Sequence, residues 1–141
     1  MLRAFVAETG WGTNVPAEAV YARSDRDTSG APYNGNRSYV LHFRLGELPP
    51  VKAFWSVTMY APDRFFVANP INRYAIGDRT PGLQYGKDHS LDIYIQHDPP
   101  PGHESNWLPA PSGPFSLSMR LYLPKASAIE GRYRYPTVRA V

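Results

Sequence analysis

Hydrophobic and polar residues alternate in four segments of the chain, and this period of two residues predicts β-strands. The segments are 38–44, 52–60, 91–96 and 115–123. In 91–96, for example, Leu91, Ile93 and Ile95 lie on one face, and Asp92 and Tyr94 lie on the other. One apolar and one polar face are typical of a half-buried strand. The four segments therefore predict the main strands of one sheet or of two facing sheets.

Weaker strand patterns at 18–23, 73–76 and 133–138 bring the expected number of strands to about seven. The 15 prolines and 11 glycines are spread along the chain, which indicates many short elements joined by turns. A short helix is predicted over 2–9, ending at Gly10. Prolines in the connections exclude parallel βαβ units. We predict a mostly β fold, an antiparallel β-sandwich or jelly-roll-like domain with a short N-terminal helix.

The length of 141 residues, with 43% hydrophobic and 19% charged residues, predicts one globular domain over 1–141. No stretch reaches the roughly 18 apolar residues of a membrane-spanning helix. Arg3 and Glu8 interrupt the apolar part of the opening segment, so no export signal is recognised. We therefore expect no membrane partner, and the compartment stays open.

The chain has no cysteine, which excludes disulfides, a thiol nucleophile and a thiolate metal site. Its net charge of +3 comes from scattered arginines, of which the densest group is Arg132, Arg134 and Arg139. Alternating tyrosines in this stretch could stack on bases, but a solvated terminal strand explains it equally well. Nucleic-acid binding proteins usually concentrate their charge, so no nucleic acid is expected as a partner.

The polar faces of the predicted strands offer the first candidate binding site. If these strands share a sheet or face each other, their polar residues line one surface with donors, acceptors and aromatic rings. Such a surface on a jelly roll can hold a sugar or a small acid, because rings pack on apolar patches and arginine forks a carboxylate. A solvated outer face is the alternative. The residues that we assign to ligand binding here are Arg120, Tyr122, Tyr60, Tyr94 and His42.

Two loops provide a second group of candidates, Asn72 with Arg73 and Asn106 with Trp107. Arg73 could reach a carboxylate of a ligand or pair with Asp78, and Trp107 could provide a stacking platform. Asparagines in proline-rich loops can also cap their own backbone. We include all four loop residues in the predicted ligand site, with backbone capping as the alternative.

Metal and catalytic motifs are weak. The loop with His97, Asp98, His103 and Glu104 lacks the H-x-H pair of a cupin site. The segment from Asp25 through Asp27 and Ser29 to Gly30 starts like a calcium loop, but Asn36 replaces the bidentate glutamate, so a polar turn is preferred. No G-x-S-x-G is present, although His42 or His97, oriented by Asp92, could activate a strand serine, Ser56, Ser116 or Ser118. We predict no metal and no cofactor, and leave catalytic residues and enzymatic activity open.

An ordered set of short motifs extends along most of the chain. It comprises LPPV at 48–51, FWS at 54–56, TMY at 58–60, NP at 69–70, NRY at 72–74, NWLP at 106–109, and Arg120, Tyr122 and Pro124. This set resembles the domain-of-unknown-function family 1214. The resemblance implies the C-terminal half of a longer, often exported bacterial protein, following another domain of unknown function. It implies no reaction and no catalytic residue.

Two classes of function follow from these observations. One is a binding module for a small polar or carbohydrate-like ligand. The other is an accessory domain that forms an oligomer or meets the N-terminal domain that the resemblance implies, through a face left exposed here. A hydrolase is a third alternative, and it requires a nucleophile or acid within hydrogen-bond reach of a base.

Overall fold

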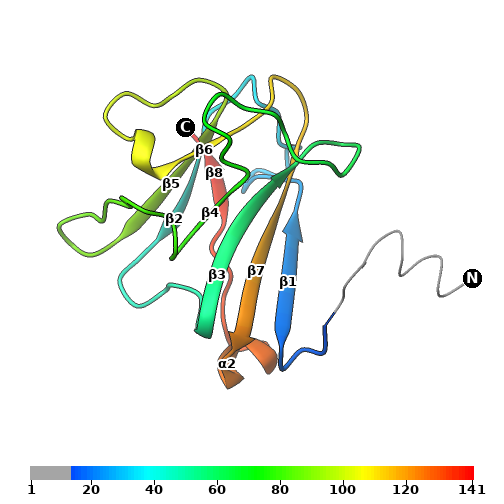
Figure 1. The fold of residues 1–141 in the computed structure, drawn as a ribbon, viewed down its shortest axis with the longest axis vertical. Coiled ribbons are helices and arrows are strands. Elements are labelled where there is room, and N and C mark those ends of the chain that lie inside the picture. Colours follow the sequence, from blue (N-terminus) through cyan, green and yellow to red (C-terminus); the bar gives the residue numbers. More distant parts are fainter. Residues whose placement is uncertain (1–13) are drawn as a thin grey trace, which may run out of the picture.

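The computed structural model describes residues 14–141, which form two four-stranded β-sheets with very little helix (Figure 1). The strands are β1 (Ala19–Ser24), β2 (Tyr39–Phe43), β3 (Val51–Tyr60), β4 (Ala75–Gly77), β5 (Leu91–Gln96), β6 (Trp107–Pro109), β7 (Ser116–Pro124) and β8 (Val138–Ala140). The helical turns are η1 (Glu104–Asn106) and α2 (Ala126–Ile129), the latter at the end of β7. No helix in this described part of the chain has the length and apolar character needed to cross a bilayer.

The first sheet has the strand order β1-β7-β3-β4, and the second has the order β6-β5-β2-β8. The long strands β3 and β7 pair antiparallel in the centre of the first sheet, from Phe54 opposite Tyr122 to Tyr60 opposite Ser116. In the second sheet β2 pairs antiparallel with both β5 and β8, whereas β6 pairs parallel with β5. The predicted antiparallel arrangement is therefore wrong for this one pair, and the strand order does not confirm a jelly roll.

The inward faces of both sheets contribute to one hydrophobic core. Its members alternate with outward residues along the four main strands, as the period of two predicted. Burying one large apolar side chain stabilises the fold by about 1.5–3 kcal/mol, so the apolar positions turn toward the core. The polar positions between them therefore point outward. The main core residues are Trp55, Val57, Met59, Leu117, Met119 and Leu121 of the first sheet, and Tyr39, Leu41, Phe43, Leu91, Ile93 and Ile95 of the second.

The four main strands are confirmed with bounds that shift by at most one residue. Of the weaker predictions, 18–23 matches β1, but 73–76 and 133–138 only overlap the starts of β4 and β8. The Arg/Tyr alternation after 132 misled the prediction, because Tyr133 and Tyr135 pack against each other with ring centroids 5.0 Å apart. Strand β6 was not predicted, since its three residues are all buried and show no alternation. The predicted helix 2–9 lies outside the described residues.

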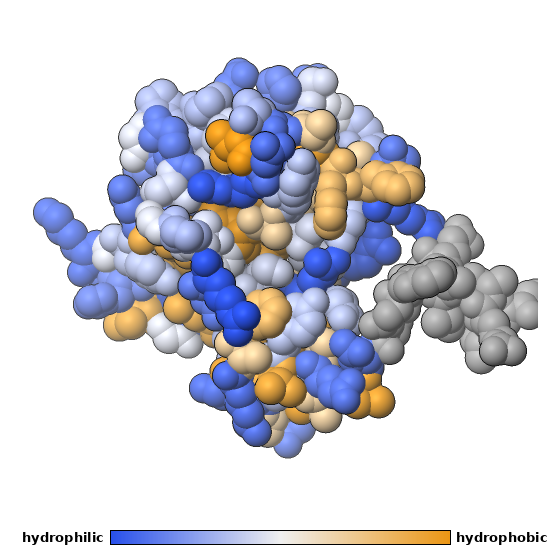
Figure 2. Space-filling view, in the orientation of Figure 1, coloured by the Kyte–Doolittle hydropathy of each residue, from blue (hydrophilic) through white to orange (hydrophobic). Residues whose placement is uncertain are grey.

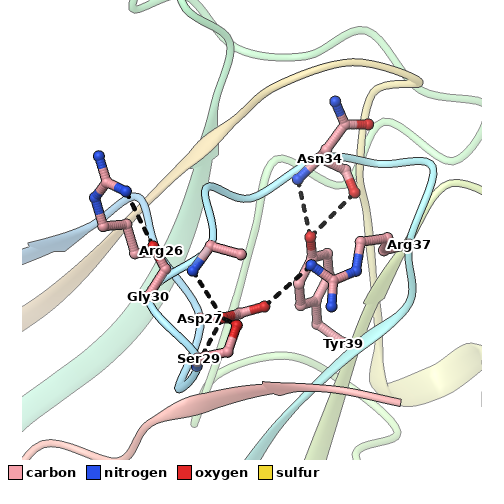
Figure 3. A network of polar contacts seen from close by, with 8 residues as sticks. Arg26, Asp27, Ser29, Gly30, Asn34, Arg37 and Tyr39 are labelled. Atoms are coloured by element: carbon pink, nitrogen blue, oxygen red, sulfur yellow. Dashed lines mark hydrogen bonds and ion pairs between the residues drawn. The ribbon is translucent and has the colours of Figure 1, made fainter.

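The connection between β1 and β2 is held by Asp27, whose side chain is 1% exposed. Its Oδ1 accepts hydrogen bonds from the backbone N–H of Ser29 at 2.8 Å and of Ala31 at 3.2 Å, and from the Ser29 hydroxyl (Figure 3). Its Oδ2 accepts no well-aligned hydrogen bond but lies 3.3 Å from Nη1 of Arg37. The pKa of Asp27 is lowered, mainly by the hydrogen bond from the Ser29 hydroxyl and further by the backbone donors and Arg37. This segment is therefore the polar turn that was preferred over a calcium loop.

Candidate functional site

The predicted strand-face residues divide between the two sheets. Arg120, Tyr122 and Tyr60 lie on β7 and β3 in the first sheet, whereas Tyr94 and His42 lie on β5 and β2 in the second. Because both sheets turn their apolar faces toward the shared core, the two polar groups point away from each other. The common surface expected from the sequence is therefore not formed, and the two faces have to be considered separately.

Arg120 lies in the middle of the outer face of the first sheet, opposite Tyr21 of β1 and Ser56 of β3. Its Nη2 donates a hydrogen bond to the hydroxyl of Tyr60, and its guanidinium carbon lies 5.7 Å from the centroid of that ring. Its Nε is buried and has no hydrogen-bond partner. Since guanidinium carries five N–H donors in a planar fork, this arginine has unused capacity to bind an acceptor.

The strand register places aromatic rings on both sides of this arginine. On one side, the ring of Tyr122 stacks on that of Phe54 with centroids 4.3 Å apart, and the guanidinium of Arg79 covers Phe54 at 4.0 Å. Both faces of Phe54 are thus in use, so this ring is a wall rather than a free platform for a sugar.

On the other side, Phe66 stacks with both Tyr60 and Tyr74, with centroid separations of 5.5 Å and 5.3 Å. Phe66 comes from the loop between β3 and β4 and is 54% exposed. Its ring folds back over the end of β3 because two tyrosines there offer it apolar contact. The two stacks leave the guanidinium of Arg120 between aromatic walls.

The floor between these walls is polar. Thr58 and Ser118 face each other across β3 and β7, and only 1% and 6% of these residues are exposed. The hydroxyl oxygen of Thr58 has no hydrogen-bond partner. Three buried side-chain polar atoms among the described residues lack such a partner, and two of them, in Thr58 and Arg120, lie on this face. A buried polar group without a hydrogen-bond partner lowers stability by about 1–3 kcal/mol. A ligand that hydrogen-bonds to these two atoms would remove that cost.

We call this surface the Arg120 face and define it by its outward residues on the three longer strands, which are Tyr21, Phe54, Ser56, Thr58, Tyr60, Ser118, Arg120 and Tyr122. A hollow of about 430 Å³ adjoins it over β3 and β4. Phe54 and Ser56 line this hollow together with Arg79, and the predicted residues Asn72 and Arg73 also line it. The Arg120 face and this hollow together form the candidate site.

The outer face of the second sheet is arranged differently. Nδ1 of His42 lies 2.6 Å from Oδ1 of Asp92 directly across β2 and β5, and both side chains are more than a third exposed. Tyr94 stacks on the ring of His103 with centroids 4.5 Å apart, and burial raises the pKa of its phenol. His42 and Tyr94 thus have partners from their own sheet and loop.

The serine candidates for hydrolysis do not meet the His42–Asp92 pair. Ser56, Ser116 and Ser118 belong to the first sheet, on the opposite side of the core from the His42–Asp92 pair. Within residues 14–141, no three His, Asp or Glu side chains are close enough to hold a metal ion.

Three of the four predicted loop residues have structural roles. Nη1 of Arg73 donates to the backbone oxygens of Glu104, Ser105 and Trp107 at 2.8–3.1 Å, and burial lowers the pKa of this guanidinium. The Nε1–H of Trp107 donates to the backbone oxygen of Gln96 at 2.9 Å, and Trp107 is only 2% exposed. Trp107 is thus buried and not a stacking platform, and the alternative pairing of Arg73 with Asp78 is not formed.

Asn106 is 5% exposed and bridges two other segments through its side chain. Its Nδ2 donates to the backbone oxygens of Gln84 and Asp92, and its Oδ1 accepts from the N–H of Gln84. Asn72, in contrast, is exposed with a φ of 51°, and its Oδ1 accepts a hydrogen bond from Tyr74. Of the loop residues, only Asn72 and the stem of Arg73 remain available at the hollow.

Sequence reasoning missed Tyr21, Phe54, Phe66, Tyr74 and Arg79 on this side of the molecule. Phe54 could have been predicted, because it alternates in step with Ser56 and Tyr60 and so lies on the polar face of its strand. Phe66 and Arg79 lie in loops without periodicity, so no local pattern could place them over β3. Their positions depend on how the β3–β4 connection, for Phe66, and the β4–β5 connection, for Arg79, fold back over the sheet.

Comparison with known proteins identifies the family of this domain. The family model described as a protein of unknown function, DUF1214, matches residues 18–126. The chain belongs to the DUF1214 family. The matched region runs from the residue before β1 to the start of α2 and therefore contains the whole Arg120 face. No curated protein matches the chain.

Two solved structures are similar to this DUF1214 domain. The crystal structure of the VPA0106 protein from Vibrio parahaemolyticus is 35% identical, with a TM-score of 0.81 over 96% of this chain and 33% of that chain. An uncharacterized protein from Burkholderia cenocepacia is 14% identical, with a TM-score of 0.51 over 91% of this chain and 30% of that chain. The second likeness concerns the fold alone. The chain thus spans about a third of the length of these structures.

Proposed function

We propose that this DUF1214 domain is a β-sandwich binding module and that its Arg120 face holds a small polar, carbohydrate-like ligand that carries a carboxylate. The observation that carries the proposal is the guanidinium of Arg120, held between two aromatic stacks with a buried, unpartnered Nε. A carboxylate accepts two parallel N–H bonds from guanidinium, and such charge-assisted pairs are about twice as strong as neutral hydrogen bonds.

The neighbours of Arg120 define the rest of the ligand. Thr58 and Ser118 provide hydroxyls on the floor, and the hydroxyl of Tyr60 is already oriented by the arginine. These groups match the alternating hydroxyls of a sugar acid or hydroxy acid. Arg79, over Phe54 at the edge of the hollow, adds a second positive charge. Because the faces of the middle rings are occupied, we assign specificity to hydrogen bonds and charge rather than to sugar stacking.

The test is thermal unfolding with glucuronate, galacturonate, tartrate and citrate, and with glucose as an uncharged comparison. A ligand at 100 times its Kd adds about 2.7 kcal/mol to the stability, which gives a measurable rise in Tm. Arg120→Ala should abolish the rise, and Arg120→Lys should keep only part of it because lysine lacks the planar fork. Arg139→Ala is the matched control, since it removes the same charge from the outer face of the second sheet.

The outcomes separate a binding role from a structural one. If Arg120→Ala lowers the Tm but each folded molecule keeps its ligand affinity, Arg120 only supports the fold. If Arg139→Ala abolishes binding instead, the ligand belongs to the face with His42 and Tyr94. Either result would contradict the proposal.

A second candidate function, docking against another domain or another copy, is favoured by the lengths of the relatives. The chain matches only a third of the VPA0106 protein, so two thirds of that chain are available to contact the corresponding domain. Leu123 and Ile129, at the α2 end, are 48% and 45% exposed. Figure 2, however, shows the apolar residues of that view in several separate areas among hydrophilic ones. Light scattering of the purified domain tests self-association, and a concentration-dependent dimer would favour docking.

A further inference from the structure

A cavity of about 250 Å³ lies between the two sheets, lined by residues of the edge strands β1 and β8 and of the core between them. Its inner wall consists of core side chains from both sheets, which are Leu41, Val57, Leu117, Met119 and Val138. None of the residues that define the Arg120 face lines it. The cavity is therefore a separate feature of the fold.

The sequence of β1 explains why this space is not filled. Two inward positions of this strand carry small residues, Ala22 opposite Met119 and Ser24 opposite Leu117. The central strands β3 and β7 place large side chains at their inward positions. Protein cores are normally packed without large voids, so the small side chains at these two positions leave this space open at the edge of the core.

Three polar residues of the cavity lining, Ser24, Tyr33 and Asp27, contact partners within the protein. The hydroxyls of Ser24 and Tyr33 are hydrogen-bonded to each other at 2.8 Å, and Asp27 is bound by Ser29 and faces Arg37. The inner wall consequently offers apolar contact. An apolar cavity of about 150 Å³ excludes water and binds benzene in another protein, so this larger one has room for a bicyclic ring.

The cavity reaches the surface next to Tyr135, Thr28 and Arg26, which are all exposed. Partial burial raises the pKa of Tyr135, so its phenol remains a neutral hydrogen-bond donor and acceptor at ordinary pH. Backbone and side-chain polar groups at this rim can bind one polar atom of a ligand whose rings occupy the interior.

We propose that the cavity between β1 and β8 binds a small aromatic molecule of about the size of indole, with its single polar group at the Tyr135 rim. This site is independent of the Arg120 face and takes a different chemical class of ligand. Its occupant fills the space that Ala22 and Ser24 leave open, and it joins the two edge strands by apolar contact.

The direct test is a methyl NMR titration of the unaltered protein with indole. We expect shifts at methyl signals of Leu41, Leu117 and Val138, no shifts at Leu91 and Ile95 elsewhere in the core, and a rise in Tm at saturation. No shift up to the solubility limit of indole, or shifts confined to residues outside the cavity, would overturn the proposal.

Ala22→Leu extends the test, because leucine places its side chain in the cavity. We expect indole affinity to fall at least tenfold and the Tm without ligand to rise. Ala61→Leu is the matched control, since Ala61 is also partly buried against the core but does not line the cavity. Unchanged indole binding in Ala22→Leu would refute the assignment. If Ala22→Leu does not fold, the indole titration of the unaltered protein decides whether the cavity binds. Arg120→Ala should give the same indole titration as the unaltered protein.

Discussion

Replacing Asn106 by alanine is expected to destabilise the fold strongly, although the sequence placed this residue in a ligand site. The amide side chain makes three hydrogen bonds to the backbone of other segments, to Gln84 O at 2.7 Å, to Asp92 O at 2.9 Å and from Gln84 N at 2.8 Å. Its Oδ1 also accepts a longer hydrogen bond from the neighbouring Ser105 hydroxyl at 3.3 Å. The side chain therefore joins the segment before β6 to β5 and to the loop that contains Gln84.

The magnitude follows from these three bonds. Each intramolecular hydrogen bond contributes about 0.5–1.5 kcal/mol net, and a buried group left without a partner costs about 1–3 kcal/mol. Asn106 is 5% exposed, so water cannot easily replace the amide after truncation. We expect Asn106→Ala to lower the free energy of unfolding by about 3 kcal/mol, from three bonds at about 1 kcal/mol each.

The assay is equilibrium unfolding in urea, followed by tryptophan fluorescence. Trp107 is adjacent to the mutated residue and almost fully buried, so its emission reports the native state. With an m-value of about 1–3 kcal/mol/M, the midpoint should fall by about 1–3 M without a change in m. Asn36→Ala is the control, because Asn36 is exposed and its loss should stay within about 0.5 kcal/mol.

A loss below about 1 kcal/mol for Asn106→Ala, or one no larger than that of the control, would refute this reasoning. It would mean that the three backbone groups find water or new partners at little cost. Asn106 would then return to the list of candidates for ligand binding.

Two further predictions concern the backbone and the pH dependence of stability. Gly77→Ala places a Cβ 2.1 Å from the backbone oxygen of Trp55, so unfolding in urea should show a loss of at least about 1–3 kcal/mol, whereas Gly113→Ala, with open space, should be nearly neutral. Asp27→Asn should destabilise at neutral pH, because hydrogen bonds from Ser29 hold the native pKa below its ordinary value of 3.8. This stabilisation is present above pH 3.8 and is lost as the pH falls through the native pKa. The urea midpoints of wild type and variant should therefore converge in acid. A difference between the two midpoints that stays constant with pH would contradict the assignment.

The candidate site shows how far local patterns reach. The parity of Arg120 and Tyr122 within their strand correctly predicted that they face outward. The same argument for His42 and Tyr94 was correct strand by strand, but it could not show that β2 and β5 belong to the other sheet. Parity is a property of one strand, whereas the membership of a sheet depends on which strands pair across long sequence separations.

The loops illustrate the opposite case. Asn106 and Trp107 stood out because polar and aromatic residues in a proline-rich loop are typical of binding sites, and nothing local indicates burial. Only the folded chain brings the backbone of Gln84 and Asp92 to the Asn106 amide, and that of Gln96 to the Trp107 ring. These contacts join residues 11 to 22 positions apart in the sequence.

The sequence by itself determined the β class, the four main strands, their buried faces and the family. The physical reason is that the period of two and the gain from burial act within each strand, without reference to its neighbours. The tertiary structure alone decided the pairing into two sheets, the parallel β5–β6 pair, the aromatic walls around Arg120 and the cavity beside Ala22. These features depend on how separate segments pack together, and many pairings satisfy the same local alternation.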